Sequence, residues 1–179
     1  MAKNKNLLKL VYSAVCLALA MVLPLFLGQV QIFMQGISPM HIPALLCGLI
    51  CGPAYGAVVG FIAPLLRSLI FSMPPMAVAI PMAFELAVYG LVAGLLFKAL
   101  KKMNFWPRTY IAMIAAMLLG RIVGGAAKAV VMGIGGEGYS FSAFVSAYFV
   151  GTSVGMVLHL IIVPLILFAL YRAKLLPDD

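Results

Sequence analysis

Apolar residues fill most of this chain in long stretches, and only short polar segments interrupt them. The stretches cover residues 7–27, 39–51, 54–71, 79–100, 110–134 and 144–171. A helix needs about 20 mostly apolar residues to cross a bilayer, and all but the second stretch come close to or exceed that length. The pattern therefore predicts an all-α membrane protein, a compact bundle of six transmembrane helices that forms a single domain over residues 1–179.

The second predicted helix is short. Ser38 and Pro39 have the pattern of an N-cap followed by proline at the first helical position, and Gly52 with Pro53 ends the helix. The helix is then about 13 residues and roughly 20 Å long, at 1.5 Å per residue. It either crosses the membrane with help from its neighbours or forms a re-entrant pair with the third helix.

Positive charges orient the predicted bundle. Lysines and arginines precede the first span, surround the connection between the fourth and fifth spans, and follow the last span, whereas residues 28–40, 72–78 and 135–143 contain none. Positive loops stay in the cytoplasm, so both termini and the 98–108 loop are expected there. The N-terminus also has features of a signal peptide, with Ala18 to Ala20 as a cleavage site. Removing it would leave five spans and disturb the charge pattern.

Composition supports a multi-pass protein of the cell membrane. The chain is 65% hydrophobic and only 9% charged, with a mean hydropathy of +1.19. Its pI of 9.6 does not predict a nucleic-acid partner, because the basic residues form no stripe with aromatic residues. The three cysteines, Cys16, Cys47 and Cys51, have no spacing typical of a disulfide framework or metal site. No cofactor, catalytic residue or nucleotide-binding motif is predicted, and membrane lipid is the expected surrounding.

Four charged residues fall inside the apolar stretches and away from their cytoplasmic ends: Arg67, Glu85, Arg121 and Lys128. Charge at membrane depth is costly and marks function by default. Three of the four are cations, which indicates a pocket for a small anionic molecule toward the outside. Arg67 and Glu85 either form a buried ion pair or contact the ligand. Arg121 and Lys128 are seven residues apart and share a helix face, and we expect Lys128 to contact the ligand.

Further ligand-contact candidates lie in and after the first outer loop. Residues 28–36 place Gln31 and Gln35 beside Met34. Amide groups next to an adaptable apolar side chain suit a lid over a small polar molecule, although an ordinary interfacial loop has the same composition. His41, at the outer start of the second helix, either contacts the ligand or caps the helix.

Aromatic candidates for the pocket are tyrosines. Trp106 lies in the cytoplasmic loop, so Tyr89, Tyr139 and Tyr148 are left as stacking platforms, and Tyr89 is the choice among the ligand-binding residues. His159 is deep in the sixth span. It is expected to pack and form hydrogen bonds there, with a proton relay as the alternative.

Small residues four apart occur in every predicted span. The later spans carry glycine pairs, and the first span carries Ala14 and Ala18. Such pairs let helix backbones approach closely, either inside the bundle or at a partner protein.

The segment GISPMHIPALLCGLICGPAYGAVVGFIAPLLRSLIFSMPP, continuing through AFELAVYGLVAGLL, resembles the membrane-embedded S components of energy-coupling factor (ECF) vitamin transporters. The likeness is strongest over residues 36–97. It implies high-affinity binding of a micronutrient from outside and delivery to an EcfT-like transmembrane coupling subunit that works with two ATPase subunits. Ala14 and Ala18 match the alanine motif with which many S components dock onto that subunit.

The excess of cations predicts an acidic vitamin. Pantothenate is the leading candidate, lipoate or another acidic vitamin comes next, and thiamine is disfavoured by its positive charge. The main alternative is an ion-coupled secondary transporter of a small organic anion, although the two halves show no inverted repeat. A small channel and a membrane enzyme are further alternatives. The chain shows no catalytic constellation for the last of these.

Overall fold

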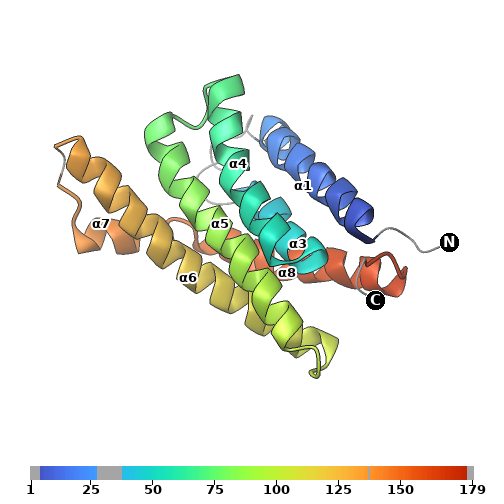
Figure 1. The fold of residues 1–179 in the computed structure, drawn as a ribbon. Helices are drawn as coiled ribbons and strands as arrows, with labels where there is room; N and C mark the ends of the chain where they lie inside the picture. Colours follow the sequence, from blue (N-terminus) through green and yellow to red (C-terminus); the bar gives the residue numbers. More distant parts are fainter. Residues whose placement is uncertain (1–4, 28–37, 137, 177–179) are drawn as a thin grey trace.

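The computed structural model describes residues 5–27, 38–136 and 138–176 (Figure 1). The secondary-structure elements are α1 (Lys5–Leu27), α3 (His41–Cys51), α4 (Pro53–Phe71), α5 (Met76–Ala99), α6 (Phe105–Ile134), α7 (Phe141–Val145), the π-helix η1 (Ser146–Val150) and α8 (Ser153–Arg172). Five segments of the described chain are long and apolar enough to cross a membrane, when α7, η1 and α8 are taken together. With the short α3 they form the predicted six-helix bundle.

The sixth predicted span is broken. Ser140 caps α7 by accepting a hydrogen bond from the Ala143 amide, and the chain then passes through η1 before α8 begins at Ser153. Single-turn π-helices such as η1 occur inside α-helices, frequently at functional sites. An apolar pattern predicts a helix here but contains no signal for the break.

The start of α3 differs from the prediction. Ser38 is no N-cap: it has a positive φ of 44°, and its carbonyl accepts a hydrogen bond from the His41 amide at 3.0 Å. The helix begins at His41, after this turn. Its end is as predicted, because Gly52 has φ 101° and Pro53 opens α4. A φ of this sign favours glycine.

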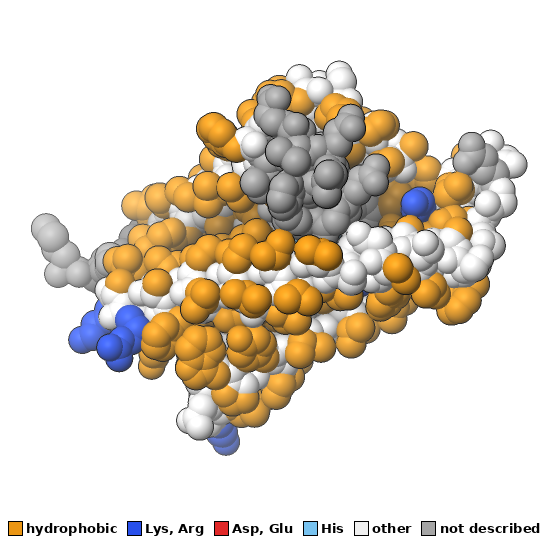
Figure 2. Space-filling view, turned by 180° about the vertical axis from the view of Figure 1, so that it is seen from behind, with side chains coloured by type: hydrophobic (Ala, Val, Ile, Leu, Met, Phe, Trp, Pro, Cys, Tyr) orange, Lys and Arg blue, Asp and Glu red, His pale blue; other side chains and the backbone are white. Residues whose placement is uncertain are grey.

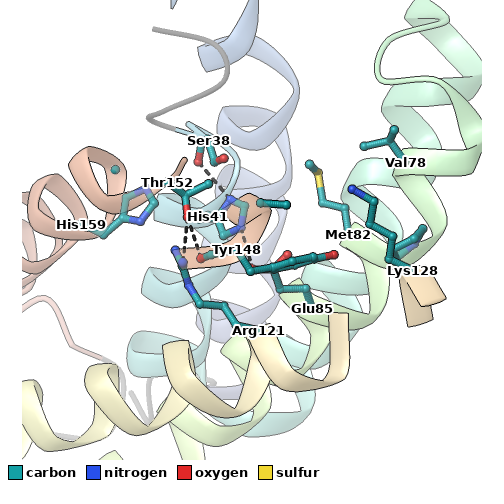
Figure 3. A pocket seen from close by; sticks show the side chains of 13 residues that line it. Ser38, His41, Val78, Met82, Glu85, Arg121, Lys128, Tyr148, Thr152 and His159 are labelled. Carbon is teal, nitrogen blue, oxygen red and sulfur yellow. Dashed lines mark hydrogen bonds and ion pairs between the residues drawn. The ribbon is translucent and has the colours of Figure 1, made fainter. Parts of the chain in front are cut away.

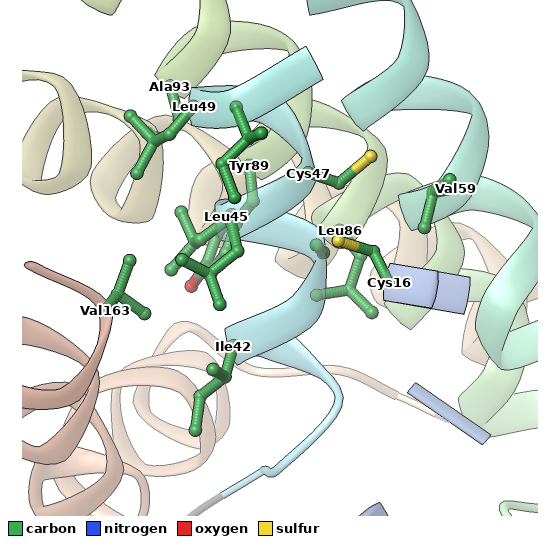
Figure 4. Packing of buried hydrophobic residues seen from close by; sticks show 14 of the residues in the cluster. Cys16, Ile42, Leu45, Cys47, Leu49, Val59, Leu86, Tyr89, Ala93 and Val163 are labelled. Atoms are coloured by element: carbon green, nitrogen blue, oxygen red, sulfur yellow. The ribbon is translucent and has the colours of Figure 1, made fainter. Parts of the chain in front are cut away.

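Helix α3 occupies the centre of the bundle, and all of its residues are buried. Figure 4 shows its side chains surrounded by Cys16 of α1, Val59 of α4, Leu86 of α5 and Val163 of α8. At about 1.5 Å per residue, its 11 residues measure roughly 16 Å, about half the hydrocarbon thickness. Helix α3 is therefore too short to cross the hydrocarbon region by itself.

Glycines bring α3, α4 and α5 into backbone contact. A Cβ on Gly48 would lie 2.2 Å from the carbonyl oxygen of Gly90, and a Cβ on Gly90 would lie 2.2 Å from the carbonyl oxygen of Gly56. No side chain fits at such separations, so these small residues pack the bundle itself. We call Gly48, Gly56 and Gly90 the glycine seam.

The outer face of α1 behaves differently. Ala14 and Ala18 are exposed, while Cys16 and Ala20 on the opposite face are buried in the core. Figure 2 shows hydrophobic side chains over the flank of the bundle, with most Lys and Arg atoms toward its ends. This distribution fits lipid contact along the flank. Both chain ends lie at one end of the bundle in Figure 1, the end that the charges place in the cytoplasm.

Candidate functional site

A cavity of about 190 Å³ lies toward the outer end of the bundle (Figure 3). Its walls come from the start of α3, the outer halves of α5 and α6, η1 and the start of α8. The lining residues are Ser38, His41, Val78, Pro81, Met82, Glu85, Arg121, Lys128, Ala147, Tyr148, Thr152, Gly155 and His159. We call this the polar cavity. The predicted residues His41, Glu85, Arg121 and Lys128 all line it.

One continuous set of hydrogen bonds joins three helices beside the polar cavity. Arg121 donates from Nη1 to Thr152 Oγ1 at 2.7 Å and from Nε to the Tyr89 hydroxyl at 3.1 Å. The Tyr89 hydroxyl donates in turn to Glu85 Oε1 at 3.0 Å. Arg121 and Glu85 are 3% and 6% exposed, so each of these bonds satisfies a charge that has left water.

His41 extends this network on the other side of Glu85. Its Nδ1 lies 3.0 Å from the Ser38 carbonyl oxygen, and its Nε2 lies 3.5 Å from Glu85 Oε1. A carbonyl oxygen only accepts hydrogen bonds, so the His41 Nδ1 atom carries a proton. The contact between His41 Nε2 and the Glu85 carboxyl is attractive only if a second proton lies between them, on the imidazole or on the carboxyl. The His41 ring also stacks on His159, with centroids 5.6 Å apart. His41 is therefore the first residue of α3 and not its cap, and its ring lies between the Ser38 carbonyl and the Glu85 carboxyl.

Arg67 has a different environment. Its Nη1 donates to the Met21 carbonyl oxygen at 2.6 Å, and its guanidinium lies 5.2 Å from the Phe71 ring centroid. Of the two alternatives for Arg67 and Glu85, the buried ion pair is therefore not formed. The reason is helix placement: α4 turns this residue toward α1, near Pro24, where helical hydrogen bonding is interrupted, whereas Glu85 on α5 faces α3.

Arg67 lines a second cavity of about 400 Å³, which we call the apolar cavity. Most of its wall is proline, methionine and valine, from the ends of α1, α3 and α4 and the start of α5. The two cavities share four lining residues: Ser38, His41, Val78 and Met82. The two spaces are therefore neighbours, separated by side chains and not by a helix.

Lys128 and Arg121 reach the polar cavity from opposite sides, with Tyr148 between them (Figure 3). The Lys128 ammonium lies 5.6 Å from the Tyr139 ring centroid. Among the described residues, no carboxylate lies within ion-pair distance of Lys128. The polar cavity therefore has two basic side chains, Arg121 and Lys128, whereas its one carboxyl group already contacts Tyr89 and His41.

Two glycines on α6, between Arg121 and Lys128, let neighbouring helices approach. A Cβ on Gly124 would lie 2.7 Å from Glu85 Cβ, and a Cβ on Gly125 would lie 2.1 Å from the Phe144 ring. Glycines at these two positions leave space beside α6. The space is taken by α5 and α7, which closes the polar cavity around its charged groups.

Other expected contacts are distributed differently. Gln31, Met34 and Gln35 lie outside the described residues. Tyr89 is fully buried and lies behind the cavity wall, where its hydroxyl bridges two charged groups. Thr152 was not anticipated. A lone threonine in the apolar sixth span was the only available signal for it.

An all-helical membrane bundle that encloses a polar, cationic cavity near one face defines a protein that binds a small solute within the membrane. A family model described as ECF transporter, substrate-specific component matches residues 8–176, and the chain belongs to this family. It is a multi-pass protein of the cell membrane and binds substrate for ECF-type uptake. Members of this family are transporter subunits rather than enzymes. No curated protein and no solved structure matched the chain.

Proposed function

We propose that this chain binds a small organic acid in the polar cavity, with pantothenate as the leading candidate. The bound molecule is passed to a transmembrane coupling subunit that two ATPase subunits drive, and Ala14 and Ala18 form the docking face. The observation that carries the proposal is the charge balance of the polar cavity, where Arg121 and Lys128 face one carboxyl group that protein groups already hold.

The charge balance favours a carboxylate ligand. Arg121 is buried and Lys128 is half-buried, and a ligand carboxylate between them would compensate their positive charge. Pantothenate carries one carboxylate, one amide and two hydroxyl groups. Thr152 and Tyr148 on one wall are suitable partners for the hydroxyl and amide groups, and Met82 is a suitable contact for the methyl groups.

Lipoate is the second candidate, and it makes a different demand. Its carboxylate suits the same cations, but its hydrocarbon chain and disulfide ring need an apolar space of their own. The apolar cavity next to His41 and Met82 offers one. Pantothenate, which carries polar groups along its length, does not require that apolar space.

Lys128→Ala tests the ligand contact. Its loss removes one charge-assisted hydrogen bond to the carboxylate, so pantothenate affinity should fall roughly ten- to a hundredfold. Calorimetry on the purified full chain measures this, with Lys174→Ala, an exposed cytoplasmic cation, as the matched control with unchanged affinity. Native mass spectrometry of gently purified protein identifies the bound acid by mass. Unchanged affinity in both Lys128→Ala and Arg121→Ala would refute the proposed carboxylate contact.

A further inference from the structure

A third cavity, of about 220 Å³, lies at the cytoplasmic end of the bundle, opposite the polar cavity. Its lining residues are Leu49, Ile50, Phe97, Lys98, Lys101, Arg108 and Leu176. Helix α3 ends at Cys51, while its neighbour α5 continues farther, to Ala99, and a hollow remains beside the last turn of α3. We call it the basic cavity. Binding of substrate from outside does not use it.

Three cations of the basic cavity come from the end of α5, the following loop and the start of α6. A Cβ on Gly52 would lie 2.7 Å from Lys98 Nζ, so this ammonium folds back to the C-terminus of α3, where the helix dipole favours positive charge. Arg108 donates from Nε to the Phe97 carbonyl oxygen at 2.5 Å, and its guanidinium lies 3.6 Å from the Phe97 ring centroid. These contacts hold two cations in place at the cavity wall.

Aromatic side chains place the basic cavity at the level of lipid headgroups. The Phe105 ring stacks on Tyr171 at 5.0 Å, and Trp106 stacks on Phe168 at 5.0 Å. Trp106 is 40% exposed. Tryptophan and tyrosine gather at membrane–water interfaces, and Phe97 of the cavity lies 6.5 Å from Phe105.

We propose that the basic cavity binds the phosphate group of an anionic phospholipid from the cytoplasmic leaflet. The cations supply charge for the phosphate, and basic pockets between transmembrane helices on this side of a membrane suit such headgroups. The apolar lining residues Leu49, Ile50 and Leu176 contact the glycerol and upper acyl carbons. A free phosphate ion would gain nothing from that apolar wall. Lys98 and Lys101 are exposed, so the site is reachable from the membrane surface.

The test measures binding of phosphatidylglycerol to the full chain in detergent, by native mass spectrometry and by thermal stabilisation. Neutralising both lysines, in Lys98→Gln/Lys101→Gln, should weaken phosphatidylglycerol binding roughly tenfold or more. The reason is that loss of each basic residue near the membrane surface weakens binding of an anionic lipid roughly severalfold. Lys102→Gln is the matched control, because Lys102 is exposed in the same loop but does not line the cavity. It should bind phosphatidylglycerol like the unaltered chain, and phosphatidylcholine should stabilise none of the proteins.

Two further arms separate the alternatives. If the double variant does not fold, Lys101→Gln alone provides the test. It changes an exposed loop residue and keeps the fold, and it should still weaken lipid binding severalfold. Equal phosphatidylglycerol binding by the double variant and Lys102→Gln would overturn the proposal. Inorganic phosphate that stabilises the chain as well as the lipid does would also overturn it, in favour of a free anion. An acidic peptide that displaces the lipid stoichiometrically would assign the cavity to a protein partner instead.

Discussion

The Tyr89 hydroxyl is the group whose loss tests the polar network most directly. It accepts from Arg121 Nε at 3.1 Å and donates to Glu85 Oε1 at 3.0 Å, on a side chain with no exposed surface. Tyr89→Phe removes only the oxygen and keeps the ring that packs against Gly120. Two buried charged groups then each lose a partner, while the packing of α5 on α6 is unchanged.

The magnitude follows from the two bonds. A hydrogen bond to a charged group contributes about 1.5 to 3 kcal/mol, so independent losses would total about 3 to 6 kcal/mol. The two bonds share one oxygen and are not additive, and polar groups in membrane proteins find substitute partners, so we expect about 2 to 4 kcal/mol. Ligand affinity should fall as well, because Arg121 is no longer held beside the polar cavity.

Equilibrium unfolding in mixed detergent micelles measures the stability loss, and calorimetry measures the affinity. Tyr55→Phe is the matched control: Tyr55 is a half-buried tyrosine of α4, and its hydroxyl has no hydrogen bond to any described residue. Its loss should cost well under about 1 kcal/mol, since nothing is left unsatisfied. Equal stability of Tyr89→Phe and Tyr55→Phe would refute the reasoning and show that the hydrogen bonds of the Tyr89 hydroxyl contribute little.

Three further predictions concern other parts of the bundle. Gly90→Ala should destabilise the protein by about 3 kcal/mol or more in the same unfolding assay, because the new methyl group meets the Gly56 backbone. Arg67→Gln and Glu85→Gln should lower stability additively, within about 0.5 kcal/mol in a double-mutant cycle, since the two groups do not contact each other. Ala18→Trp should abolish ATP-dependent uptake in proteoliposomes that contain the coupling module, with ligand affinity of the isolated chain unchanged.

Each of these has a control and a result that contradicts it. Gly133→Ala, with nothing within 4 Å of its Cβ, should be neutral or stabilising, and a loss equal to that of Gly90→Ala would remove the case for the glycine seam. Strong coupling between Arg67 and Glu85 would restore the ion pair. Val157→Trp, on the exposed face of α8, should leave uptake intact. Uptake that needs no ATPase and ignores Ala18→Trp would favour the ion-coupled transporter.

The sequence predicted the bundle because its signals are local. Apolar length sets the spans, Gly52 with Pro53 ends α3, and the seven-residue spacing of Arg121 and Lys128 puts both on one helix face. The partner of Arg67 is not a local property. It depends on which helices are neighbours, and a backbone carbonyl such as that of Met21 has no signature in the sequence.

The break in the sixth span was also beyond the reach of the sequence. Ser146–Val150 is as apolar as the helix around it, so hydropathy gives a continuous span where the backbone forms a π-turn. Thr152 follows this turn and enters the polar network only because the turn places it there. The site therefore combines residues that composition identifies, such as Arg121, with residues that only the fold brings to the cavity.

The two walls of the polar cavity differ in how they are held. On one side lies the start of α3, a helix that is buried along its whole length and bounded by the glycine seam; on the other lies η1, where no residue is buried. Moving the first wall would separate backbones in direct contact, whereas moving the second gives up little packing. We therefore expect exchange of the bound molecule with the outside to depend on η1. Substitutions there should change the association and dissociation rates by similar factors, so that their ratio, the affinity, is nearly unchanged. Substitutions in the wall formed by α3 should change the affinity itself.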